Sequence, residues 1–244
     1  MMTQTWSGLL SRKQLRRYVR PGKRWLDRAQ AGATAVARGK PSTVVLDTGV
    51  CNLDSMMRAL VHCGANATIA QRPDDFQFAS RIILPGVGTF RAAMVGMERL
   101  RYIDPIRQAA KSGVPILGVC VGMQILASRG MEGGNYEGLD LIPGIVKPLL
   151  PRKDERIPHV GWNEVVPAGD CPLLAGLVPS TDFYFVHSFH FVPADPVFTV
   201  ATTPHGGGFV SVVQRGNIFG TQCHLEKSQQ AGFTVLRNFL ALDL

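Results

Sequence analysis

Short apolar runs that end at glycine or cysteine alternate with segments of helical periodicity along the first half of this chain. Residues 42–49 (STVVLDTG), 81–88 (RIILPGVG) and 114–120 (VPILGVC) are such runs. Between them, apolar side chains recur every three or four positions, as at Leu53, Met56, Met57, Leu60 and Val61. This order predicts an α/β fold, flavodoxin-like and doubly wound, with a parallel central sheet flanked by helices.

The second half of the chain lacks this alternation. Short strand-like runs follow one another with turns between them: 144–150 (GIVKPLL), 159–166 (HVGWNEVV), 183–192 (FYFVHSFHFV), 198–203 (FTVATT), 209–216 (FVSVVQRG) and 218–224 (IFGTQCH). We expect the sheet to become mixed or antiparallel here, with 205–209 (HGGGF) as a hairpin turn. A last helix is predicted to follow, with Ser228 as the cap near its start.

The net charge of +8 lies at one end of the chain. Residues 1–40 hold ten Lys or Arg and one acid, whereas residues 41–244 hold 16 bases and 17 acids. We therefore predict a basic N-terminal extension at 1–40, flexible or partly helical, and one domain at 41–244. A transit peptide or a nucleic-acid arm has a similar composition, but few aromatic residues accompany the charges, so nucleic acid is not a predicted partner.

Composition narrows the class of protein further. The chain is 45% hydrophobic, and no apolar run reaches the roughly 18 residues that span a bilayer, so we expect a cytoplasmic protein without membrane contact. Five cysteines form neither a CxxC pair nor an even framework. We therefore expect reduced thiols, no metal site and no cofactor.

One cysteine lies where a reactive nucleophile would be placed. In "GVCVG", Cys120 follows an apolar strand, and Gly118 and Gly122 flank it. Such a tight strand-to-helix turn exposes a nucleophile at the mouth of a parallel sheet. A buried structural cysteine fits the same short pattern, so the motif needs a partner base.

His224 is the candidate base among the six histidines. Glu226 follows two positions later, and in an extended stretch both side chains would lie on the same side. A carboxylate there would orient the imidazole, so Cys120, His224 and Glu226 form a possible catalytic set. An HxE pair also arises by chance.

Together these segments resemble a known family. "PGVGTF", "GVCVGMQ", "PHVGWN", "YFVHSFH" and "NIFGTQCHLEKSQ", in this order, are similar to triad-type (class I) glutamine amidotransferases, and among them to the glutaminase subunits of imidazole glycerol phosphate synthase. The resemblance covers about residues 43–243. It implies that Cys120 attacks the carboxamide of glutamine, that His224 passes a proton to the departing ammonia, and that Glu226 holds His224.

The resemblance also implies residues that bind glutamine and the oxyanion. They are Gly86, Val87, Gly88, Val121, Gln124, Glu132 and Ser188. The family delivers ammonia to a (β/α)8 cyclase, or synthase, that makes imidazole glycerol phosphate in histidine biosynthesis. This partner would form a heterodimer with the chain. Positions implied at that interface are Asn52, Trp162, Asn163, Tyr184 and Lys227.

Four positions depart from the family pattern, and they leave alternatives open. Thr48 replaces an aromatic residue, Cys51 a glycine, Cys223 a phenylalanine and Leu225 a proline. A paralogue that supplies ammonia to another acceptor, such as a nucleotide-linked sugar, is one alternative. A non-catalytic regulatory subunit is a second, and a related cysteine hydrolase or chaperone is a third.

Overall fold

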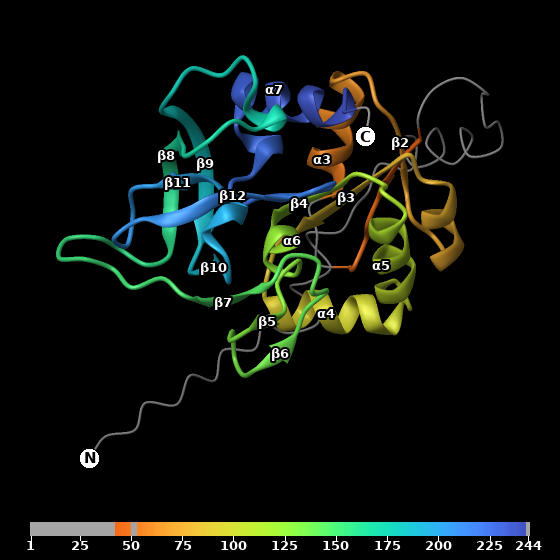
Figure 1. The fold of residues 1–244 in the computed structure, drawn as a ribbon, viewed down its shortest axis with the longest axis horizontal. Helices are drawn as coiled ribbons and strands as arrows, with labels where there is room; N and C mark the ends of the chain where they lie inside the picture. The colour runs from red at the N-terminus through yellow and green to blue at the C-terminus, as the bar shows by residue number, and fades with distance from the viewer. Residues whose placement is uncertain (1–41, 50–52, 243–244) are drawn as a thin grey trace, which may run out of the picture. The chain divides into compact units, whose positions relative to one another are not determined.

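A computed structural model of the chain describes residues 42–49 and 53–242. The predictions for the basic extension, for Cys51 and for Asn52 lie outside the described residues. The main sheet has nine strands in the order β2 (Asn66–Ile69), β1 (Ser42–Val45), β3 (Arg81–Gly86), β4 (Ile116–Cys120), β13 (Ile218–Thr221), β12 (Phe209–Arg215), β11 (Thr199–Thr203), β8 (His159–Pro167) and β9 (Thr181–His187). This arrangement, drawn in Figure 1, confirms the predicted α/β class.

Five neighbouring strands, from β2 to β13, run parallel. The helices that pack against them or follow them are α3 (Leu53–His62), α4 (Phe90–Arg99), α5 (Ile103–Lys111), α6 (Val121–Gln124) and α7 (Gln229–Leu240). Figure 1 shows α3 and α7 on one side of the sheet and α4 and α5 on the other. Because parallel strands need crossover connections, the alternation in the sequence produces this layered part of the fold.

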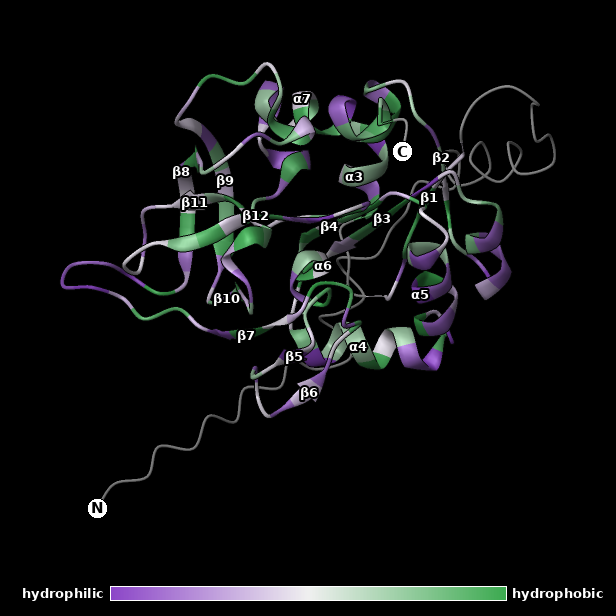
Figure 2. Ribbon diagram, in the orientation of Figure 1, coloured by the Kyte–Doolittle hydropathy of each residue, from purple (hydrophilic) through white to green (hydrophobic). Residues whose placement is uncertain are grey.

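The two faces of the sheet build two separate apolar clusters. Ile82 and Leu84 of β3 pack in the cluster that includes α4 and α5, whereas Ile83 packs in the cluster that includes α3 and α7. All six residues of β3 are buried. Figure 2 shows β3 and β4 as hydrophobic strands, which is typical of a parallel sheet covered on both faces.

The remaining strands of the main sheet are antiparallel, as the sequence predicted. β13 pairs with β12, β12 with β11, β11 with β8, and β8 with β9. Residues 204–208 connect β11 to β12, so the glycine-rich segment is the hairpin turn expected from its sequence. Short 3₁₀ turns complete the chain: η2 (Pro73–Phe78), η3 (Pro172–Leu174), η4 (Pro196–Phe198) and η5 (Leu225–Lys227).

A second sheet of four strands was not predicted. It has the order β10 (Phe189–Pro193), β7 (Gly144–Pro148), β5 (Arg129–Gly130) and β6 (Tyr136–Glu137). The run at 183–192 therefore breaks at Ser188, so that β9 joins one sheet and β10 the other. Leu149 N donates to Ser188 O at 2.9 Å, which anchors the break.

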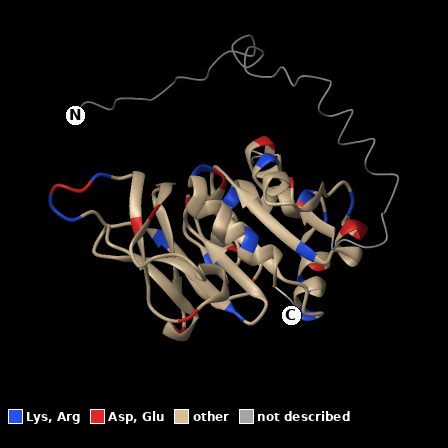
Figure 3. Ribbon diagram, turned by 90° about the horizontal axis from the view of Figure 1, so that it is seen from above, with Lys and Arg blue, Asp and Glu red and all other residues tan. Residues whose placement is uncertain are grey.

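Charged residues of both signs are interspersed over the described part of the chain, as Figure 3 shows. The excess of positive charge therefore belongs to residues 1–40 rather than to the domain. No helix among the described residues is both long enough and apolar enough to span a bilayer.

Candidate active site

Cys120 occupies a strained turn between a strand and a short helix. It is the last residue of β4 and directly precedes α6, with φ 56° and ψ −112°. A non-glycine residue in such a sparsely populated region costs on the order of 1–3 kcal/mol and persists only where the surrounding fold holds it. Turns of this kind present a nucleophile at the end of a buried strand.

Close packing around this turn requires glycine. A Cβ atom on Gly122 would lie 1.6 Å from the carbonyl oxygen of Leu84, and one on Gly118 would lie 2.4 Å from the carbonyl oxygen of Gly122. Gly86 pairs with Cys120 across β3 and β4, and a Cβ on it would lie 2.9 Å from Gly122 N. The glycines thus let α6 begin directly against the end of β3.

His224 and Glu226 lie together after β13. His224 Nδ1 is 2.8 Å from Glu226 Oε1, and the two side chains are 2% and 4% exposed. The prediction that they share an extended stretch is wrong, because residues 225–227 form the 3₁₀ turn η5. Ser228 lies at the start of α7 without capping it through its side chain, and its hydroxyl instead donates to His224 O at 2.6 Å.

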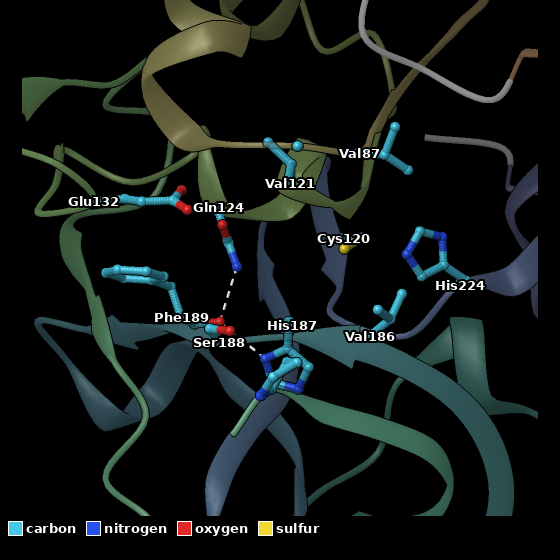
Figure 4. A pocket seen from close by; sticks show the side chains of 12 residues that line it. Val87, Cys120, Val121, Gln124, Glu132, Val186, His187, Ser188, Phe189 and His224 are labelled. Carbon is cyan, nitrogen blue, oxygen red and sulfur yellow. Dashed lines mark hydrogen bonds between the residues drawn. The ribbon is translucent and has the colours of Figure 1, made fainter. Parts of the chain in front are cut away.

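The surroundings of His224 favour its charged form. Burial lowers the pKa of His224, but the negative charges of Cys120 and Glu226, with the hydrogen bond to Glu226, outweigh burial and raise this pKa to about 10. Figure 4 shows the imidazole of His224 beside the sulfur of Cys120. The pair can therefore supply a sulfur nucleophile and an imidazolium that donates a proton.

One cavity of about 270 Å³ collects most of the predicted site residues. It is lined by Val87, Gly88, Cys120, Val121, Gln124, Glu132, Pro158, Val186, His187, Ser188, Phe189 and His224. Gly86 and Glu226 lie behind this lining rather than in it. The volume is near the lower end of ligand pockets, about 300–1,000 Å³, and so favours a ligand of amino-acid size.

Polar groups face His224 from the other side of the cavity, as Figure 4 shows for Gln124 and Glu132. Gln124 is 3% exposed, and its Nε2 donates to Phe189 O at 2.9 Å and to Gln222 Oε1 at 3.1 Å. Because both N–H groups are then used, Gln124 has only its carbonyl oxygen left for a ligand. Glu132 Oε2 accepts from Phe90 N at 2.7 Å, so this carboxylate also fixes the start of α4.

The sequence model of the class-I glutamine amidotransferases matches residues 44–242. The chain belongs to this family. Imidazole glycerol phosphate synthase subunit HisH of Moorella thermoacetica is 43% identical over 195 residues, which cover 80% of this chain and 92% of that protein. The subunit of the same name from Salinibacter ruber is 44% identical over 205 residues, which cover 82% of this chain and 94% of that protein. Within the family, the amidotransferase therefore groups with the HisH subunits.

A solved structure shows the same fold at lower identity. The structure of PurLQS from Thermotoga maritima matches with a TM-score of 0.66 and 22% identity, and the match covers 83% of this chain and 98% of that chain. The amidotransferase thus shares the fold of that structure, with Cys120 at the end of a parallel strand.

Two residues predicted at a partner interface, Trp162 and Tyr184, lie on the same face of the β8–β9 pair, and Lys227 of η5 lies against it. Trp162, 49% exposed, pairs with Tyr184 across the two strands, and their rings are 6.0 Å apart. Lys227 Nζ lies 5.5 Å from the centre of the Tyr184 ring. Tyr184 O accepts from His224 N at 2.9 Å, so this aromatic face adjoins the catalytic candidates. Asn163, in contrast, points to His159.

The departures from the family pattern are buried where they are described. Thr48 is 4% exposed, Cys223 is 1% exposed and Leu225 is fully buried. Leu225 packs closely on α7, because a Cβ on Gly232 would lie 1.9 Å from Leu225 O. These side chains therefore belong to the core and do not line the cavity.

Sequence reasoning assigned no site role to three buried polar residues in or behind the cavity lining, namely His187, His159 and Gln222. Gln222 Nε2 donates to Cys120 Sγ at 3.7 Å. His187 Nδ1 lies 2.9 Å from Phe189 O, so it must donate, and its Nε2 then accepts from His159 Nδ1 at 3.0 Å. The signal that could have found them is the number of polar side chains in otherwise apolar strand segments.

The two linked histidines should make the amidotransferase sensitive to acid. Burial is the main cause that lowers the pKa of His159 to about 4 and that of His187 to about 3, with a smaller contribution from His205. These histidines bind protons near pH 6.5 in the unfolded chain but only at lower pH in the folded one. The stability that the neutral pair contributes is therefore fully present above pH 6.5 and is lost as pH falls towards 4. We expect the free energy of unfolding to fall by about 1–2 kcal/mol per histidine between pH 7 and pH 5.

Denaturant titrations at several pH values measure this slope. The variant with His159→Asn and His187→Asn should show a shallower fall than the original chain, although it starts from a lower stability. His62→Asn, which changes an exposed histidine, is the matched control and should leave the slope unchanged. An equal slope in all three proteins would show that the buried pair does not titrate on unfolding.

Proposed function

We propose that this amidotransferase hydrolyses glutamine at Cys120 and passes the ammonia to a cyclase that makes imidazole glycerol phosphate in histidine biosynthesis. The observation that carries the proposal is the 43–44% identity to HisH subunits over nearly their whole length. The placement of Cys120 and His224 in the lining of one cavity, with Glu226 bound to His224 behind that lining, supports the chemistry.

The reaction begins when the sulfur of Cys120 attacks the side-chain carboxamide carbon of glutamine. His224, held charged by Glu226, donates a proton to the amide nitrogen, and ammonia leaves as the C–N bond breaks. The product is a glutamyl thioester on Cys120. Water, deprotonated by His224, attacks the thioester carbonyl, the C–S bond breaks, and glutamate is released.

The walls of the cavity suit a glutamine molecule. The free carbonyl oxygen of Gln124 and the carboxylate of Glu132 are acceptors for an α-ammonium group, and Ser188 lies next to them in the same lining. The backbone N–H of Val121 and a turn at Val87–Gly88 would donate to the oxyanion of the tetrahedral intermediate. Gly88 has φ +96°, a conformation that glycine adopts without strain.

The partner in this proposal is a (β/α)8 cyclase that binds the exposed β8–β9 face. Trp162 and Tyr184 there offer aromatic area that is typical of interface anchors, and Lys227 adds one cation. Asn52 remains a predicted contact outside the described residues. A cytoplasmic location stays part of the proposal, supported by free thiols at the described cysteines.

Two of the alternatives from the sequence are less well supported. A paralogue with another ammonia acceptor is not favoured, because the curated relatives named above are HisH subunits. A non-catalytic subunit is not favoured either, because the cavity keeps a cysteine beside a charged histidine. No observation favours a cysteine hydrolase that uses another acid.

The test measures glutamate release from glutamine by the chain alone, with a cyclase subunit, and with the cyclase subunit and its nucleotide substrate. Turnover that increases with the liganded cyclase, together with formation of imidazole glycerol phosphate, is the expected result. Glutaminase activity that does not respond to any cyclase state would instead indicate a different acceptor.

Replacement of Trp162 by alanine should weaken this partnership selectively. A buried aromatic anchor at an interface typically contributes about 2 kcal/mol, so the dissociation constant for the cyclase should rise by about 30-fold. Calorimetric titration of the cyclase measures this change. Val178→Ala, a substitution at a side chain that is 72% exposed and outside the β8–β9 face, is the control. Equal affinities of the two variants would place the interface elsewhere.

A further inference from the structure

Gln222 is a fully buried polar residue that lies behind the cavity and not in its lining. It directly follows β13 and precedes His224 by two positions. Its backbone N–H donates to Ser211 O at 2.8 Å, which holds this segment against β12. Burying a carboxamide costs free energy unless its N–H and C=O groups find hydrogen-bond partners. The partners of the Gln222 side chain therefore indicate what it does in the site.

The side chain of Gln222 contacts the nucleophile and a cavity residue at the same time. Its Nε2 donates to Cys120 Sγ at 3.7 Å, and its Oε1 accepts from Gln124 Nε2 at 3.1 Å. Because this group is buried, water does not compete for either hydrogen bond. One rigid amide thus connects the sulfur to the opposite side of the site.

The neighbouring groups fix which end of the Gln222 amide faces the sulfur. Phe189 O can only accept, so the nitrogen of Gln124 must face it at 2.9 Å. The same nitrogen faces Gln222, which must therefore present its oxygen there and its nitrogen to Cys120. An exchange of the two ends would place two donors against each other, so the orientation does not depend on an arbitrary choice of amide flip.

This chain of contacts also determines what the cavity offers to a ligand. With both N–H groups of Gln124 bound to protein oxygens, only its carbonyl oxygen can meet a ligand, and it can only accept. A cationic donor such as an ammonium group is complementary to it, whereas a carboxylate is not. Without the oxygen of Gln222, the amide of Gln124 would be free to turn.

We propose that Gln222 is a positioning residue that orients the sulfur of Cys120 by donating to it and holds the amide of Gln124 in its acceptor orientation. The inference rests on the proposed glutaminase function and assigns a second role to the segment that carries His224. Gln222 contacts the substrate only through these two neighbours. Its loss should therefore alter both turnover and substrate binding.

Two substitutions separate the two contacts. Gln222→Glu keeps an oxygen for Gln124 but places a carboxylate oxygen against the sulfur. The kcat should therefore fall by about 10- to 100-fold, which is the range for one lost charge-assisted hydrogen bond. The KM for glutamine should change little. Gln222→Met keeps the volume but loses both contacts. For this variant, kcat should fall similarly and KM for glutamine should rise by about 10-fold.

The matched control is Thr221→Val in the same segment. Thr221 is 1% exposed, and its hydroxyl donates to Cys223 O at 3.3 Å without touching the cavity. This variant also loses a buried polar group in the same segment. Because that group does not touch the cavity, the variant should keep wild-type kcat and KM. Unfolding curves identify the variants that fold. Gln222→Asn, whose side chain is too short to reach the sulfur, replaces any Gln222 variant that fails to fold.

Alkylation of Cys120 by iodoacetamide provides a readout that does not depend on glutamine hydrolysis. Peptide mapping follows the labelling rate of this cysteine in each folded protein. The rate should change by about 10-fold in the Gln222 variants and stay constant in Thr221→Val. If the original chain hydrolyses no glutamine, the proposed function fails while this comparison still tests the contact. Wild-type labelling rates and wild-type kinetics in the Gln222 variants would show that Gln222 only fills the core.

Discussion

Glutamate release should fall by about four orders of magnitude or more when Cys120 is replaced by alanine, the scale seen when a covalent nucleophile is removed. The variant loses the sulfur that forms the thioester, and neither His224 nor Glu226 can replace it. Because alanine keeps the Cβ atom and removes only the sulfur, the fold should change little. Initial rates of glutamate formation, measured with and without the cyclase, give the ratio.

The control for this result is another buried cysteine. Cys171 is 9% exposed and carries a free thiol, but it does not line the cavity. Cys171→Ala should therefore keep its glutaminase activity at the level of the original chain. Comparable activity in Cys120→Ala would mean that glutamine is hydrolysed by a different group.

Gly122→Ala should destabilise the protein severely, although it adds only one methyl group. Its Cβ would lie 1.6 Å from Leu84 O, a backbone atom of a central strand that cannot turn aside. Such a clash belongs to the exceptional class of substitutions that cost more than about 4 kcal/mol. We expect the melting temperature to fall by about 8–16 °C, or the variant to accumulate as unfolded protein.

Gly169→Ala is the matched comparison for this variant. Gly169 has no positive φ, and a Cβ there would meet no atom within 4 Å. The substitution should leave the stability unchanged or raise it by about 0.4–1 kcal/mol, through the lower entropy of the unfolded chain. Thermal unfolding followed by circular dichroism measures both variants. A Gly122→Ala protein as stable as Gly169→Ala would show that α6 does not approach β3 so closely.

The parallel half of the fold could be predicted because its pattern is local. Apolar runs such as 81–86 are buried, and each is followed by a segment with helical spacing. The second sheet could not be predicted in the same way. The run at 183–192 is continuous in hydrophobicity, and its break at Ser188 depends on pairing with Leu149, about forty positions earlier in the chain.

The reactive residues of the candidate site could be predicted from the sequence, whereas contacts that depend on the three-dimensional fold could not. Cys120, His224 and Glu226 combine reactive groups at recognisable spacing, so the sequence indicated them. Gln222 differs, because nothing in its neighbours shows that a carboxamide will reach a sulfur 102 positions away. The turn η5 was also missed, because two residues of an HxE pair meet equally well in an extended or a 3₁₀ segment.

The most direct test of Cys120 as the nucleophile is mass spectrometry of the chain quenched in acid during glutamine turnover. We expect the peptide containing Cys120 to gain the mass of a glutamyl group, and this adduct to be absent from Cys120→Ala. If glutamate accumulates while every cysteine peptide stays unmodified, or if the adduct lies on another cysteine, then Cys120 is not the nucleophile.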